Sequence, residues 1–183
     1  MITYTTSKTE KDLLGILELQ KNNLPDNLSQ EEISREGFVT VVHDFDALKK
    51  LNDIEQHVIA KDGDKVIAYL LAMTTKSKNE FPVLFSMFEN FEKIAFHGKT
   101  FSDYHYIVVG QVCVAKDYRG QGVLDNCYAE YKNQFKSKYD FAVTEINIKN
   151  QRSINAHRRI GFHEIHQFTT TDNVEWSIVV WEW

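Results

Sequence analysis

Cysteine, proline and long apolar runs are all scarce in this sequence of 183 residues. The two cysteines, Cys113 and Cys127, are too few for a disulfide framework and lie in no Cys/His spacing that binds metal. Two prolines and eight glycines provide no linker between domains. No stretch approaches the ~20 apolar residues of a membrane span, and the first residues lack the basic and apolar regions of a secretory signal. We therefore expect a cytoplasmic protein without a membrane partner.

The composition is that of one folded domain over residues 1–183, with 43% hydrophobic and 26% charged residues. The net charge of −5 is unevenly distributed. Residues 116–159 contain nine Lys/Arg and five Asp/Glu, a balance of +4, which leaves −9 for the remainder. This excess of positive charge is too small for a nucleic-acid-binding surface, but it suits one anionic small molecule.

Hydrophobic periodicity predicts a mixed α/β chain with more strands than helices in its second half. A Ser7–Glu10 capping box is expected to start the first helix. The turns 62–64 and 172–173 are expected to join antiparallel strands. The predicted strands are 2–6, 38–42, 57–60, 66–72, 106–115, 141–148, 162–169 and 174–181, and the predicted helices are 9–20, one from 29, 44–51, 81–96, 123–135 and 153–160.

The strongest local signal is the glycine-rich turn from Arg119 to Leu124, between a strand and a helix. Glycines let the backbone approach a ligand, and a helix start presents N–H groups and a positive dipole end to an anion. Asp125 occupies the place of the third glycine of a dinucleotide-binding fingerprint, and no Gly-Lys-Ser/Thr follows as in a P-loop. The two interpretations are a phosphate or pyrophosphate site and a plain glycine turn.

A second motif follows this turn at a suitable distance. The segments VCVAKDYRGQGVLDNCYAEY and TEINIKNQRSINAHRRIGF together resemble the two motifs of the GNAT superfamily of acetyl-CoA-dependent N-acetyltransferases. Arg119 and Gly122 match the first motif, in which Leu124 replaces a small residue. The second motif is matched by Asn150, Ser153 and the Gly161-Phe162 pair, with His157 in place of the usual tyrosine. The resemblance covers roughly residues 106–168.

The resemblance implies a mixed, mostly antiparallel twisted sheet of six to seven strands, flanked by helices and splayed at the cofactor site. It also implies that acetyl-CoA is the co-substrate. The spacing of the cysteines and histidines predicts no metal. One strand would pair with the pantetheine arm, the turn would hold the pyrophosphate, and the second motif would bind pantetheine again. The residues concerned are Val112, Cys113 and Val114; Arg119, Gly120, Gln121, Gly122, Val123, Leu124 and Asp125; and Asn150 and Ser153.

The same resemblance assigns two catalytic candidates. Glu145 stands five residues before Asn150, where ribosomal-protein N-acetyltransferases of this superfamily carry a base. A glutamate is ionised at neutral pH and can accept a proton, whereas the alternative is a solvated or salt-bridged strand residue. His157 stands where the family has its acid, and the alternative is a packing histidine.

We expect direct acetyl transfer to a primary amine in a ternary complex, the acceptor being a small molecule or a peptide. A non-catalytic acyl-CoA-binding or regulatory domain is the alternative, and a longer acyl group or an alcohol acceptor is a third reading. The family layout places residues 81–106 on the acceptor side, and a homodimer is possible.

Two further features are interpreted as structural. His163 and His166 are three apart on a predicted strand, so without a bulge they face opposite sides and share no metal. Trp176, Trp181 and Trp183 are expected to be core and packing residues of a strand.

Overall fold

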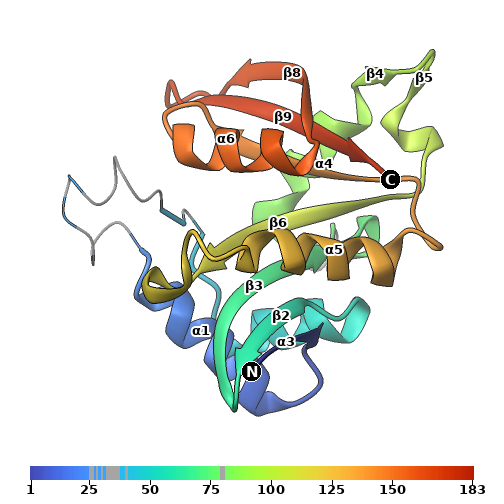
Figure 1. The fold of residues 1–183 in the computed structure, drawn as a ribbon. Helices are drawn as coiled ribbons and strands as arrows, with labels where there is room; N and C mark the ends of the chain where they lie inside the picture. Colours follow the sequence, from blue (N-terminus) through green and yellow to red (C-terminus); the bar gives the residue numbers. More distant parts are fainter. Residues whose placement is uncertain (25–26, 28, 30, 32–37, 40, 79–80) are drawn as a thin grey trace. The chain divides into compact units, whose positions relative to one another are not determined.

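The fold was determined as a computed structural model that describes residues 1–24, 27, 29, 31, 38–39, 41–78 and 81–183 (Figure 1). Internal contacts group the chain into two compact units, which are described separately. The first unit contains Met1–Ala72 and Val109–Gln134, and the second contains Met73–Val108 and Phe135–Trp183. Among these described residues, no helix combines the length and apolarity needed to cross a membrane.

The described residues form one sheet of seven strands in the order β1-β2-β3-β6-β7-β9-β8. The β6–β7 pair is parallel, whereas β1–β2, β2–β3, β7–β9 and β8–β9 are antiparallel. The expected mixed, mostly antiparallel sheet is therefore confirmed. The strands are β1 (Ile2–Thr6), β2 (Val58–Asp62), β3 (Lys65–Met73), β6 (Tyr106–Val114), β7 (Phe141–Asn147), β8 (His163–Thr169) and β9 (Glu175–Glu182).

The first helix, α1 (Glu10–Lys21), begins two residues later than the predicted capping box requires. Thr9 is the N-cap, and its side chain and that of Asp12 form the capping box reciprocally. The Ser7–Glu10 box is wrong because Ser7 is fully buried and its hydroxyl bonds to Asn52 and to the carbonyl oxygen of His57. Ser7 is thus held in the interior by Asn52 and His57, and Thr9 makes the cap.

Asp44 caps the second described helix of this unit, α3 (Phe45–Ile54), by accepting from the amide of Ala47 at 2.8 Å. The helix predicted from Ser29 lies mostly outside the described residues. The strand predicted at 38–42 is wrong for the described residues of that range, which form coil. Side chains hold this coil in place of a strand partner: the Gln111 amide donates to the Val41 carbonyl at 2.8 Å.

Three buried polar residues of the first unit, Gln20, His43 and His57, make hydrogen bonds in the interior. The Gln20 amide donates to the His43 carbonyl at 3.1 Å and accepts from the His43 amide at 3.2 Å. His57 is completely buried, and its Nδ1 accepts from the Ala72 amide at 3.1 Å. Burial lowers the pKa of His57 to about 3, so this ring is neutral in the folded protein at neutral pH.

The second unit contains the segment 74–105, which is rich in aromatic residues. Its helix α4 (Pro82–Glu92) ends earlier than the predicted 81–96 because a small hairpin follows, formed by β4 (Ala95–Phe96) and β5 (Lys99–Thr100). Phe88 and Phe91 each lie within 6.4 Å of the ring of Tyr106, which stacks on Phe141 at 6.0 Å. This cluster is the aromatic core of the unit.

The second unit ends with α6 (Gln151–Ile160) and the β8–β9 hairpin. Gly161 ends α6 at φ +119°, and a Cβ there would lie 3.1 Å from Trp181 Nε1. The register of β8 shifts between Glu164 and His166. The predicted opposite orientation of His163 and His166 is therefore wrong, because the bulge brings both to the same face of the sheet.

Candidate functional site

The end of β6 offers an open strand surface in the first unit. From Gly110 onward exposure alternates: Val112 and Val114 are half-buried, whereas Cys113 is buried. The amide of Ala115 donates to the Ile67 carbonyl in β3, so the backbone groups of Val112 and Val114 point away from β3. The β6–β7 ladder contains only three residue pairs and ends at Val108–Val143. An extended ligand can pair with the part of β6 that lies beyond this ladder.

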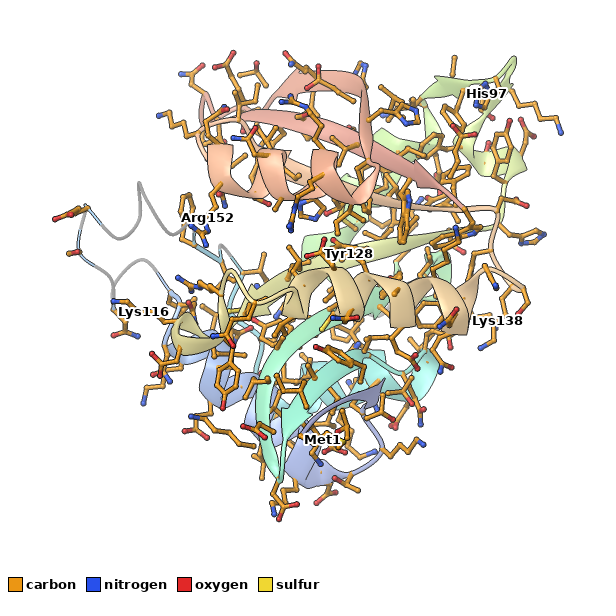
Figure 2. All side chains as sticks on the ribbon, viewed as in Figure 1. Met1, His97, Lys116, Tyr128, Lys138 and Arg152 are labelled. Carbon is orange, nitrogen blue, oxygen red and sulfur yellow. The ribbon has the colours of Figure 1, made fainter. Side chains whose placement is uncertain are left out.

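The turn after β6 has the backbone shape expected of an anion site. A short 3-10 helix, η4 (Lys116–Tyr118), leads to Gly120 and Gly122 at φ +72° and +77° (Figure 2 labels Lys116). A Cβ at Gly120 would meet nothing within 4 Å, and one at Gly122 would lie 3.8 Å from Asn126. Glycine is thus required here by the left-handed backbone and not by crowding. The helix α5 (Val123–Phe135) starts directly after this turn.

Three side chains donate hydrogen bonds to backbone carbonyl oxygens around the turn. Gln121 donates to the Asp117 carbonyl at 2.7 Å, and Asn126 donates to the Gly122 carbonyl at 2.9 Å. Arg119 donates from Nε to the Val114 carbonyl and from a terminal nitrogen to Asn23 Oδ1 at 2.7 Å. The Val114, Asp117 and Gly122 carbonyls are thus bonded within the protein. The N–H groups of the first turn of a helix suit a phosphate.

The other predicted residues of the turn differ in exposure. Val123 is buried, whereas Leu124 and Asp125 are half-buried at the start of α5. Cys113 stays a thiol at neutral pH because burial raises its pKa to about 12. A protonated, buried thiol is a poor nucleophile, so Cys113 is not suited to carry an acyl group.

Glu145 lies in the middle of β7 in the second unit, with its side chain mostly buried. Its Oε2 atom is fully buried and has no hydrogen-bond partner among the described residues. Burial raises the pKa of Glu145 to about 7. A carboxyl group that titrates near neutral pH, and has a vacant acceptor oxygen, matches what a general base requires.

The second predicted motif lies at the start of α6 on one face of the helix. Asn150 is the N-cap, and its Oδ1 accepts from the Ser153 amide at 3.1 Å. His157 is 4% exposed, and its Nδ1 lies 2.8 Å from the Ser153 carbonyl, which fixes Nδ1 as the protonated nitrogen. Burial lowers the pKa of His157 to about 4, and Phe162 packs edge-on against the ring. These features favour the packing alternative, and the acid role stays a prediction.

The structure thus gathers the predicted residues into two groups, one in each unit. Val112–Asp125 form a strand end, turn and helix start in the first unit. Glu145, Asn150, Ser153 and His157 lie on β7 and α6 in the second. Sequence reasoning missed that Trp176 lies on the opposite face of β9 from Trp181, on the face of Glu145. The signal was available, because an odd separation of five residues places two strand residues on opposite faces.

The comparisons with known proteins agree with this geometry. The sequence model of the acetyltransferase (GNAT) family matches residues 16–162. The ribosomal-protein-S18-alanine N-acetyltransferase of Escherichia coli superimposes with a TM-score of 0.60 at 14% identity, covering 100% of this chain and 94% of that one. A putative acetyltransferase of Salmonella typhimurium, solved with its cofactor acetyl-CoA, gives 0.63 at 13% identity, covering 99% and 93%.

At 13% and 14% sequence identity, these two structures show that the fold is shared, but they do not show a shared substrate or mechanism. No curated protein matches the chain. The family match extends over most of the sequence and includes both motif regions described above. The chain belongs to the acetyltransferase (GNAT) family.

Proposed function

We propose that this protein transfers an acetyl group from acetyl-CoA to a primary amine by direct attack in a ternary complex. The observation that carries the proposal is Glu145, a mostly buried carboxyl group whose unpartnered oxygen titrates near neutral pH. The Escherichia coli relative is named for acetylating an alanine of a ribosomal protein, which supports an amine acceptor. Small-molecule and peptide amines are both within this proposal.

The residues at the turn fit the CoA part of the co-substrate. The start of α5 would hold the pyrophosphate, and the backbone of Val112 with the amide of Val114 would pair with the pantetheine arm, since the Val114 carbonyl accepts from Arg119. Asn150 and Ser153 are proposed to bind pantetheine as well. When bound, acetyl-CoA supplies a thioester that an amine can attack. No metal is part of the proposal.

Glu145 is proposed to remove the proton that the attacking amine must lose. An aliphatic ammonium group has a pKa near 10, so most of the amine is protonated at neutral pH and a base is needed. Glu145 Oε2 is the accepting atom. Because Cys113 stays protonated, transfer through an acyl-cysteine is not proposed.

Two measurements on the unmodified protein test this function. Acetyl-CoA at 100 times its dissociation constant stabilises the folded state by about 2.7 kcal/mol, which raises the melting temperature. Free CoA is then measured with acetyl-CoA and a panel of amines. Stabilisation with CoA release supports the proposal. Stabilisation without release on any amine would favour a non-catalytic acyl-CoA-binding domain, and absence of both would overturn the cofactor assignment.

The turn is tested by a matched pair of glycine variants. Gly120→Ala is expected to weaken acetyl-CoA binding at least tenfold, because a side chain strains the left-handed backbone that aims the N–H groups. Gly63→Ala, at φ +58° in the β2–β3 turn and with equally open surroundings, is the control. Both variants should lose about 1–2 kcal/mol of stability. Calorimetry that finds equal acetyl-CoA affinity in the two variants would remove the turn from the site.

A further inference from the structure

The strand registers of the second unit place a row of side chains across the face that carries Glu145. Directly paired residues of neighbouring strands point to the same face. Glu145 pairs with Ile178 of β9, which pairs with His166 of β8. In the next row, Asn147 pairs with Trp176, which pairs with Phe168. Trp176 and Phe168 are therefore the aromatic neighbours of Glu145 on its own face.

This face is closed at one end and open at the other. Phe141 and Val143 precede Glu145 on the same face and are buried, and the cluster of Phe88, Phe91 and Tyr106 covers Phe141. Figure 1 shows α4 behind β9 and α6 in front of it. Beyond Glu145, the residues Asn147, Trp176 and Phe168 are partly exposed. This less buried end is the side of the face from which an acceptor within the second unit would approach Glu145.

The indole of Trp176 is not held by a specific contact. It makes no ring contact or hydrogen bond with any described residue, whereas the ring of Trp181 packs on Phe162 and the Trp183 indole donates to the Tyr139 carbonyl at 2.6 Å. A partly exposed indole without a hydrogen-bond partner among the described residues offers a flat apolar surface and one N–H donor.

The charges on this face select against an anionic acceptor. The strands β7, β8 and β9 contain no lysine or arginine. The ionisable groups on the Glu145 face are Glu145, Glu182, His163 and His166. Lys78, which precedes α4, is already paired with Glu92 at 2.9 Å. A carboxylate on the acceptor would find no cation on these strands and would lie near carboxylates.

Resting on the function proposed above, we propose that Trp176, assisted by Phe168, is a specificity-determining residue for a primary amine that carries a flat apolar group and no carboxylate. Trp176 is one strand over and two residues along from Glu145, a diagonal of about 7–8 Å. This distance fits an amine nitrogen at Glu145, a short linker and a ring against the indole. A peptide with an anionic first residue does not fit this surface.

Three matched amines test the inference by CoA release: 2-phenylethylamine, propylamine, which lacks the ring, and L-phenylalanine, which adds a carboxylate. The unmodified protein is expected to show a KM at least tenfold lower for 2-phenylethylamine than for the other two. Trp176→Ala should raise that KM at least tenfold without changing kcat, the KM for propylamine or the KM for acetyl-CoA. Trp176→Phe should restore the KM for 2-phenylethylamine to within about threefold of the value in the unmodified protein. Trp183→Ala, which removes a tryptophan that packs on Trp181, is the control.

Equal effects of Trp176→Ala on all three amines would overturn the inference, as would a preference for L-phenylalanine. The proposed function can fail independently. If no amine releases CoA, calorimetric titration of 2-phenylethylamine still tests the role of Trp176. Binding to the unmodified protein that is lost in Trp176→Ala supports this role. Binding of equal affinity in both proteins, or no binding to either, overturns it. Release of CoA with propylamine, without binding of 2-phenylethylamine, would support the proposed acetyl transfer but overturn the proposed preference for a flat apolar group.

Discussion

Glu145→Gln is expected to lower kcat by about 10²–10⁴-fold, the usual contribution of a positioned base, while the acetyl-CoA dissociation constant changes less than threefold. The amide keeps the shape of the side chain but cannot accept the amine proton as a base. Steady-state kinetics and calorimetry measure the two quantities. Because the pKa of Glu145 is raised to about 7, kcat/KM of the unmodified protein should rise with pH through about 7, where the carboxylate forms.

Although Glu145→Gln is expected to lower kcat, it is expected to raise the stability of the folded protein at alkaline pH. A pKa raised from 4.5 to about 7 means that folding favours the protonated acid. This contribution to stability is complete below pH 4.5 and is lost as the pH rises through 7. At pH 8 the variant should therefore exceed the original protein by up to about 3 kcal/mol in free energy of unfolding, measured in urea. The advantage should vanish near pH 4.5.

His157→Gln is the matched control for the catalytic assignment, since it also replaces a buried candidate with a neutral amide. The packing interpretation expects kcat to change less than threefold, with some loss of stability. A large fall in kcat at unchanged acetyl-CoA affinity would instead establish the acid role of His157. Retention of full turnover in Glu145→Gln would contradict the role of Glu145 as the base.

His57→Gln is expected to reduce the sensitivity of the fold to mild acid. The pKa of His57 falls from 6.5 to about 3 on folding, so below pH 6.5 the unfolded chain binds a proton that the folded chain does not. Stability from the neutral ring is complete above pH 6.5 and is lost as the pH falls toward 3. Between pH 7 and pH 5 this amounts to about 2 kcal/mol.

The measurement is the difference between the free energies of unfolding at pH 7 and pH 5, in the original protein and in His57→Gln. The variant should show about 2 kcal/mol less loss, although it is less stable at pH 7, because glutamine fills the site less well. Glu145 titrates in the opposite direction over this range and is common to both proteins, so it cancels in the comparison. Identical pH dependences would show that His57 does not control acid stability.

The sequence predicted the regular elements well where periodicity was strong. The seven sheet strands and α1, α3, α5 and α6 were all expected within a few residues, and both turn hairpins were correct. The expected strand at 38–42 was wrong for residues 38, 39, 41 and 42, because its β-rich composition is also compatible with a coil whose backbone bonds to a side chain. Local composition does not reveal that Gln111, some seventy residues away, supplies the hydrogen bond.

The residues of the candidate site remain predictions, and their environment could not be predicted from the sequence. The resemblance of the two motifs to the family pointed to the turn, to Asn150 and to Glu145. The burial that moves the pKa of Glu145 to about 7, and that of His157 to about 4, depends on packing against distant segments. The bulge in β8 had no clear signal either, and it decides that His166 shares the face of Glu145.

The coil that replaces the predicted strand constrains how this sequence can diverge. Gln111 accepts from Tyr69 at 2.5 Å while it donates to Val41, and Gln20 similarly serves His43 as both donor and acceptor. Glutamate cannot donate, and leucine can do neither. Val42, between the two contacts, is 68% exposed and free to vary. An alignment of relatives through this irregular segment is therefore best anchored on the two glutamines, which lie in other elements, and not on the residues of the coil itself.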